Sequence, residues 1–169
     1  MVAQDKVDYR GLQTLIAAPD YQRFRARKYF PLTGDAKPKH RGQQTFNRAQ
    51  ALEIAAAAEL APTIGEAKLM RKVLLKLVPN LVDPYRHSST PCNYAIVNPA
   101  NGAVQEIHGT DAAGPIESIF NAVRDRRSGW GPKPPEREPI AGHVVLVNLV
   151  EIRARVDRAF EASNEDSAA

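Results

Sequence analysis

The chain has 169 residues, of which 43% are apolar and 25% charged, and its 23 basic and 19 acidic residues give a formal net charge of +4. This is the composition of a globular protein, and it excludes a wholly disordered chain, a collagen-like rod and a disulfide scaffold. The single cysteine favours a reducing cytoplasm. No apolar run approaches the roughly 20 residues that cross a bilayer, so we expect no membrane association and no export.

The N-terminal part is predicted to be helical. Asp8 is an N-cap for a helix over residues 9–18, which Pro19 ends. Asp20 begins a second helix over residues 21–30. Two helices joined so closely are typical of a helix-turn-helix.

Basic residues are concentrated in the same region. Residues 19–48 contain eight basic and two acidic residues, a net charge of +6, so the rest of the chain carries −2. A concentrated basic segment is the expected electrostatic signature of a nucleic-acid binder. A solvated basic face without a partner is an equally good reading of the charge alone.

Residues 32–46 contain Gly34, Pro38 and Gly42, which exclude a helix there. Residues 43–46 are expected to form one arm of a small β-hairpin. The region therefore predicts a basic hairpin that follows the second helix, as the wing does in a winged helix-turn-helix.

Two further helices carry capping signals. Asn47 and Gln50 form a capping box ahead of an Ala-rich helix that ends at Leu60. Thr63 and Glu66 form another, ahead of a helix that ends near Pro79. The apolar face of that last helix is expected to serve core or dimer packing, and it comprises Ile64, Ala67, Met70, Val73, Leu74 and Leu77.

The second half changes character after a proline-containing linker at residues 80–91. Strands are predicted over residues 93–97 and 103–108, joined by a turn that ends in Asn-Gly. A helix over residues 115–123, an irregular stretch at 128–139, a strand over 143–147, a final helix capped by Asn148 with Glu151, and a frayed tail at 163–169 complete the predicted elements.

The predicted fold class is therefore α+β. A winged helix-turn-helix domain occupies residues 1–80, a linker follows at 81–91, and a small α+β domain of hairpin, helix, strand and helix occupies 92–162. We expect the second domain to serve dimerisation or sensing.

The second helix is expected to lie in the major groove of DNA, where Arg reads guanine and Gln reads adenine. The hairpin is expected to contact phosphates or the minor groove. The candidate DNA-binding residues are Tyr21, Gln22, Arg23, Arg25, Arg27 and Lys28 on the helix, and Lys37, Lys39, His40, Arg41 and Gln43 on the hairpin.

Three segments in this order resemble the DNA-binding domain of MerR-type regulators. They are Arg27-Lys-Tyr-Phe-Pro31, Lys37-Pro-Lys-His-Arg-Gly-Gln-Gln-Thr-Phe46 and Asn47-Arg-Ala-Gln-Ala-Leu52. The resemblance covers roughly residues 7–78. It implies a winged helix-turn-helix, a homodimer and a palindromic operator in double-stranded DNA, with RNA polymerase or a small-molecule effector as further partners.

The chain departs from that family in two respects. Where members carry a Tyr-Tyr-Glu or Tyr-Trp-Glu triplet, this sequence has Phe24-Arg-Ala-Arg-Lys28. The family's long dimerisation helix is not matched, because the helix after Thr63 is predicted to stop by Pro79. We therefore expect the dimer interface in the second half, formed by Val145, Val147, Ile152, Val156 and Phe160.

Catalytic and metal-binding motifs are not found. His87 with Cys92 has no further ligands at metal spacing, and no nucleophile elbow, Walker loop or HExxH motif occurs. We expect no enzyme activity, no metal and no cofactor. The sequence predicts a cytoplasmic, nucleoid-associated DNA-binding transcriptional regulator; the alternatives are an excisionase-like or architectural DNA-bending protein, and a protein-interaction adaptor.

Overall fold

Helix α3 (Arg48–Leu60) lies at the centre of the fold. The computed structural model describes residues 6–32, 45–109 and 144–166. Most of α3 is buried, and its small alanine side chains let neighbouring helices approach closely. The predicted capping box is confirmed: the Asn47 side chain accepts the Gln50 N–H at 2.9 Å, and the Gln50 side chain accepts the Asn47 N–H at 3.0 Å.

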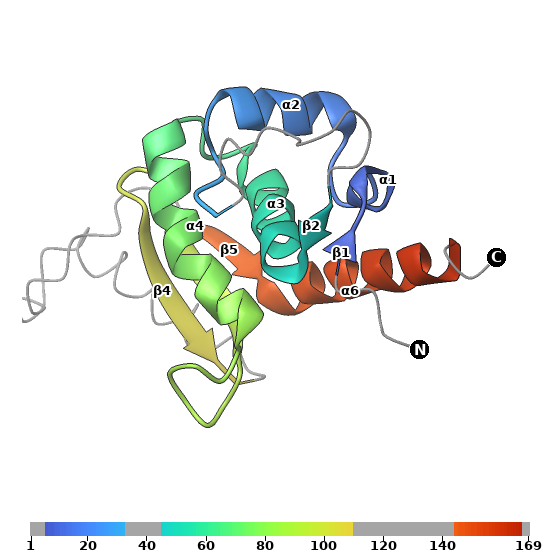
Figure 1. Cartoon of the computed structure of the whole chain (residues 1–169). Helices are drawn as coiled ribbons and strands as arrows, with labels where there is room; N and C mark the ends of the chain where they lie inside the picture. Colours follow the sequence, from blue (N-terminus) through green and yellow to red (C-terminus); the bar gives the residue numbers. More distant parts are fainter. Residues whose placement is uncertain (1–5, 33–44, 110–143, 167–169) are drawn as a thin grey trace, which may run out of the picture.

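Two long helices pack against α3. Helix α4 (Ala67–Val82) lies along one side and α6 (Leu149–Asp166) crosses beneath it (Figure 1). The predicted apolar stripe of α4 is confirmed: Ala67 is half-buried, and the rest, Ile64, Met70, Val73, Leu74 and Leu77, are buried in the core.

A three-stranded antiparallel sheet completes the core. Its strands β3 (Cys92–Asn98), β4 (Ala103–His108) and β5 (Val145–Asn148) lie in the order β4-β3-β5. The predicted hairpin is confirmed, and its turn depends on Gly102, which has a φ of +67° and donates its N–H to the Asn98 carbonyl at 2.8 Å.

A second, two-stranded sheet joins β1 (Lys6–Val7) to β2 (Phe46–Asn47). Phe46, predicted to end one arm of a local hairpin, is therefore paired with Val7 near the N-terminus instead. Between them in the chain lie α1 (Tyr9–Leu12) and α2 (Ala18–Ala26). Asp8 caps α1 as predicted, since its side chain accepts the Gly11 N–H at 2.9 Å.

The predicted boundary between the first two helices is wrong. Helix α1 ends at Leu12, where Gly11 disfavours a helix and the Thr14 hydroxyl binds the Gly11 carbonyl at 2.7 Å. Helix α2 begins ahead of Pro19, which sits in its first turn. A proline is tolerated there because first-turn N–H groups have no partner within the helix.

Helix α2 also ends earlier than predicted, at Ala26 rather than residue 30. Lys28 has a φ of +56°, the Tyr29 N–H binds the Phe24 carbonyl and the Lys28 N–H binds the Arg25 carbonyl. These two hydrogen bonds, together with the left-handed conformation of Lys28, define a Schellman motif at the end of the helix.

The boundaries of α4 differ from the prediction at both ends. Its N-cap is Glu66 without a side-chain hydrogen bond, so the predicted capping box is wrong: Thr63 instead continues the end of α3, with its N–H bound to the Leu60 carbonyl. Helix α4 also continues through Pro79 to Val82. A proline so near the C-terminal end removes only one helical hydrogen bond.

In the last helix, α6, the Asn148 side chain accepts the Glu151 N–H at 3.1 Å, as predicted. The helix continues to Asp166, so the predicted fraying of residues 163–166 is wrong. The predicted helix over residues 115–123 and the irregular stretch at 128–139 lie outside the described residues.

The described residues share one hydrophobic core. It contains side chains from the predicted N-terminal domain, such as Leu52 and Leu74, together with Ala95, Val147 and Val156 from the predicted second domain. Mixed helices and antiparallel strands around this core make the chain an α+β protein, as predicted.

Candidate nucleic-acid interface

Helix α2 is held in place by a cluster of buried aromatic rings. Tyr21 stacks on Phe30 at 5.7 Å and meets the edge of Phe46 at 5.8 Å, and Phe24 lies 5.2 Å from Tyr29. Tyr21 is only 1% exposed. It is therefore a core residue with no surface to offer DNA, contrary to the prediction.

The other candidates on α2 and at its end are accessible. Gln22, Arg23, Arg27 and Lys28 are exposed and Arg25 is half-buried. Arg23 forms an ion pair with Asp20 at 2.8 Å and its guanidinium lies 5.2 Å from the Phe24 ring centre. Its position is therefore fixed by local contacts.

The end of α2 lies close to the start of α4 (Figure 1), and two long-range hydrogen bonds join these segments. The Tyr29 hydroxyl donates to the Gly65 carbonyl at 2.7 Å and itself accepts from Arg27 at 3.2 Å. Arg71 donates to the Lys28 carbonyl at 3.2 Å. The exposed Arg27 and Lys28, which follow α2, therefore lie beside Arg71 in the first half of α4. Further along α4, Lys72 donates to the Asn101 carbonyl of the β3–β4 turn at 2.8 Å.

Helix α4 contributes basic residues that the sequence analysis did not single out. It contains no acidic residue, and its four basic residues are all exposed. The sequence signal that could have identified them is the helical spacing of basic residues on the face of α4 opposite its apolar stripe. We call the combined set the basic surface: Arg27, Lys28, Lys68, Arg71, Lys72 and Lys76.

Leu32, which follows α2 and the aromatic cluster, is anchored to the core by a hydrogen bond. The Leu32 N–H donates at 2.7 Å to Glu53, a fully buried carboxylate of α3. Residue 32 ends the first described stretch, so the predicted hairpin contacts lie outside the described residues; these are Lys37, Lys39, His40, Arg41 and Gln43.

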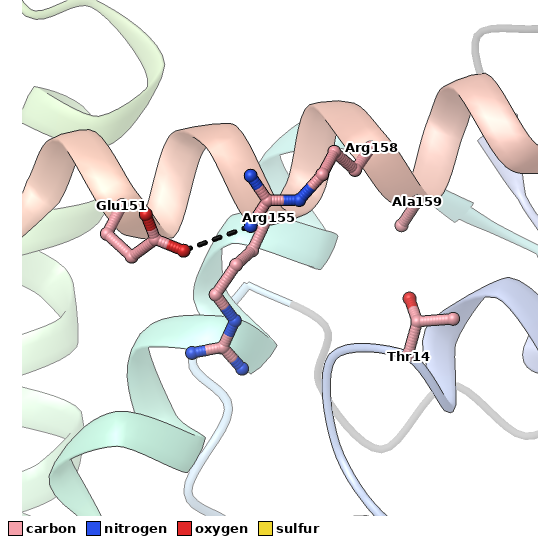
Figure 2. Close-up of a pocket in the computed structure, with 5 residues that line it drawn as sticks. All are labelled: Thr14, Glu151, Arg155, Arg158 and Ala159. Atoms are coloured by element: carbon pink, nitrogen blue, oxygen red, sulfur yellow. Dashed lines mark hydrogen bonds and ion pairs between the residues drawn. The ribbon is translucent and has the colours of Figure 1, made fainter.

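A hollow of about 400 Å³ opens between α6 and the segment after α1 (Figure 2). Its two arginines already bind protein acceptors. Arg158 lies 3.0 Å from Glu151, and Arg155 binds Glu59 at 3.4 Å and the Leu15 carbonyl at 3.1 Å. Since both cations are partly neutralised, this hollow is a weaker anion site than the basic surface.

The residues predicted for a dimer interface face the chain's own core instead. Val147, Ile152 and Val156 are at most 2% exposed, while Val145 and Phe160 are partly buried against the same core. Burial within one chain leaves the first three no surface for a partner, so their predicted role is wrong.

Apolar side chains are exposed elsewhere. Leu32, Leu75 and Val82 are each at least half exposed and line a hollow of about 350 Å³ beside α4. These exposures do not test whether two copies of the chain associate, so the homodimer stays a prediction.

Three potential metal ligands also come together, although the sequence analysis expected no metal site. Ligand atoms of Cys92, Glu106 and His108 all lie within 4.8 Å of one another. Burial, and then the Glu106 carboxylate, raise the pKa of the Cys92 thiol. The free thiol is therefore protonated at neutral pH and is not an activated nucleophile.

None of the described helices is long and apolar enough to cross a membrane. Comparison of the chain with protein-family models, with curated proteins and with solved structures finds no match.

Proposed function

We propose that this chain binds double-stranded DNA through the basic surface and acts as a transcriptional regulator of the winged helix-turn-helix type. The observation that carries the proposal is the junction of α2 and α4. There the exposed Arg27 and Lys28 lie beside the exposed Arg71, held by the Tyr29–Gly65 and Arg71–Lys28 contacts, and the other cations of α4 continue along the same helix.

The order of elements supports the winged-helix part of the proposal. Strand β1 is followed by α1 and α2, and β2 pairs with β1 just before α3. The basic residues predicted for the wing lie outside the described residues, between α2 and β2 in the chain. The resemblance to MerR-type regulators likewise implies a recognition helix followed by a wing and a capped helix.

Binding would combine two kinds of contact. The lysines and arginines of the basic surface would neutralise phosphates and release counterions, which gives affinity without sequence preference. Gln22, Arg23 and Arg27 on or next to α2 would read base edges. Each base-reading arginine replaced by alanine should then cost about 1–3 kcal/mol of binding free energy.

The decisive experiment compares two double variants in a duplex titration over a range of salt concentrations. Lys68→Gln with Arg71→Gln removes two cations from the basic surface. The matched control, Arg48→Gln with Arg158→Gln, removes two exposed cations that are ion-paired with Asp157 and Glu151. Both variants therefore carry the same net charge.

The surface variant should bind DNA more weakly, and the slope of log affinity against log salt should fall by about two, because each missing cation leaves one phosphate with its counterions. The control should match the wild type. Equal weakening in both variants would refute the basic surface as the binding site. No duplex binding at low salt would favour the protein-interaction adaptor instead.

Selection of bound sequences from random duplexes tests the remaining features. A palindromic consensus supports a homodimeric regulator, because protein two-fold symmetry is reproduced in the operator. Binding without a consensus, accompanied by strong DNA bending, would favour the architectural alternative.

A further inference from the structure

We propose that Cys92, Glu106 and His108 form a binding site for a single divalent transition-metal ion, with zinc as the best match. The proposal is independent of DNA binding. It is based on the geometry of the three side chains and on the groups that surround them.

The hairpin brings the ligands together. Cys92 at the start of β3 pairs directly with His108 at the end of β4, and Glu106 lies two residues before His108 on the same face of the strand. This is the face that α4 and α6 cover, because its other residues, Ala95 and Val97, belong to the core.

His108 is already oriented as a metal ligand. Its Nδ1 lies 3.0 Å from the Thr90 carbonyl, which can only accept, so Nδ1 carries the proton. In the neutral ring Nε2 then presents a lone pair, and it lies 3.4 Å from the Glu106 Oε2. A metal ion bound by both atoms would fit this separation, since zinc ligand atoms lie about 3.3–3.8 Å apart in a tetrahedral site.

Asn80 orients the Glu106 carboxylate toward His108. This α4 residue is 1% exposed and donates its Nδ2 to the Glu106 Oε1 at 2.7 Å, which leaves Oε2 to face His108. Its own Oδ1 has no hydrogen-bond partner among the described residues. A second group that orients a ligating carboxylate and a hydrogen bond that fixes the imidazole are the usual surroundings of a metal site.

Charge and size select the ion. The Cys92 thiolate and the Glu106 carboxylate would together neutralise a 2+ charge, so a partly buried site would carry no net charge. Sulfur, nitrogen and oxygen ligands on one centre suit zinc, whose bonds of about 2.0–2.3 Å place tetrahedral ligand atoms about 3.3–3.8 Å apart. Since the three atoms lie within 4.8 Å, a contraction of about 1 Å completes the arrangement.

The surroundings leave a route to the ions in solution. The side chains of His108 and Glu106 are 25% and 30% exposed, while Cys92 is fully buried behind them. Arg153 binds the Cys92 carbonyl at 3.1 Å and the Asn93 side chain at 3.2 Å, which holds the start of β3 against α6. The thiol is therefore fixed at the inner end of the site.

The test titrates the untagged full chain, freed of metal by a chelator, with Co²⁺ and then with Zn²⁺. Cobalt should produce the charge-transfer absorption of a cobalt–thiolate bond, and zinc should abolish it by displacement. Zinc should also raise the melting temperature, since a ligand that binds only the folded state stabilises it.

Variants assign the ligands. Asn80→Ala removes only a supporting group and should weaken cobalt binding roughly 10–100-fold. Glu106→Gln and His108→Gln each remove a ligand and should weaken cobalt binding at least as much. His87→Gln and Glu66→Gln replace exposed residues of the same types and should bind cobalt like the wild type.

Absence of a cobalt–thiolate band in the wild type would overturn the proposal. Unchanged affinity in both Glu106→Gln and His108→Gln would overturn it as well, because the thiol would then bind cobalt without them. Cys92 is fully buried, so Cys92→Ser can unfold the chain. The partly exposed His108 and Glu106 keep the test decisive, with circular dichroism as the check on folding.

Discussion

Lys28 adopts the left-handed backbone conformation that ends α2, and the strain of this conformation leads to a specific prediction of stability. A residue with a Cβ in the left-handed region costs about 1–2 kcal/mol, whereas glycine adopts it freely. Lys28 has a φ of +56°. Lys28→Gly removes that strain but also gives the unfolded chain more conformational freedom, which costs about 0.4–1 kcal/mol. The net expectation is a gain of about 0.5–1 kcal/mol in the free energy of unfolding.

The control is Lys28→Ala, which removes the same charge and the same long side chain but keeps the Cβ. The difference between the two variants therefore isolates the backbone conformation from the loss of the cation. Urea denaturation should place the glycine variant about 0.5–1 kcal/mol above the alanine variant with equal slopes. In a protein of this size that is a melting temperature higher by about 1–4 °C.

The reasoning would be refuted if the alanine variant were as stable as the glycine variant. The rest of the motif would then have to follow a different geometry, including the Tyr29 N–H bond to the Phe24 carbonyl and the packing of those two rings. Duplex binding supplies a second comparison. Both variants lack the same cation of the basic surface, so their DNA affinities should fall equally while their stabilities differ.

Two other predictions follow from close packing and from burial. Gly11→Ala should lower stability by about 1–3 kcal/mol, because the added Cβ would overlap the buried Val7 side chain; an unchanged urea midpoint would contradict this packing. In metal-free protein, burial and the Glu106 carboxylate hold the pKa of Cys92 above its ordinary value of 9.0. The unfolded thiol ionises first, so stability should fall as pH rises above 9.0, and Cys92→Ala should lack that component of the fall. Urea midpoints of wild type and variant on either side of this pH provide the comparison.

The sequence predicted best the elements for which two signals agreed. Helix α3 had both a capping box at Asn47 and an uninterrupted run of strong helix formers, and its N-terminal boundary is confirmed. The stripe on α4 and the β3–β4 hairpin were likewise supported by periodicity together with turn chemistry. Helix ends judged from proline alone were wrong. Pro19 occupies a first turn, where its missing N–H has no helical partner to lose, and Pro79 occupies the last turn, where it removes one hydrogen bond without ending the helix.

The predicted dimer-interface role of Val147, Ile152 and Val156 was wrong for a different physical reason. The apolar pattern of Val147, Ile152 and Val156 correctly indicated burial, but periodicity does not say which surface covers an apolar face. In the structure the cover is supplied by the same chain, since α6 packs on α3, α1 and β3. The cations of α4 lie outside the +6 segment in the sequence, and the tertiary contacts of Tyr29 with Gly65 and of Arg71 with Lys28 bring α4 beside that segment.

The Cys92–Glu106–His108 cluster depends on one irregularity that a regular hairpin would not contain. The pairs from Asn98 with Ala103 to Tyr94 with Ile107 follow a constant register, which would continue by placing Asn93 opposite His108 and Cys92 on the other face of the sheet. A bulge between Cys92 and Tyr94 shifts the pairing by one residue, so Cys92 pairs with His108 and turns toward the face of Glu106. A one-residue shift exchanges the two faces of a strand. A hairpin predicted from its turn alone, without the bulge, would therefore place the Cys92 thiol on the face opposite Glu106 and His108. The Asn93 side chain binds the Gly109 carbonyl at 2.8 Å and accepts from Arg153 at 3.2 Å, and these tertiary contacts fix the bulge in place.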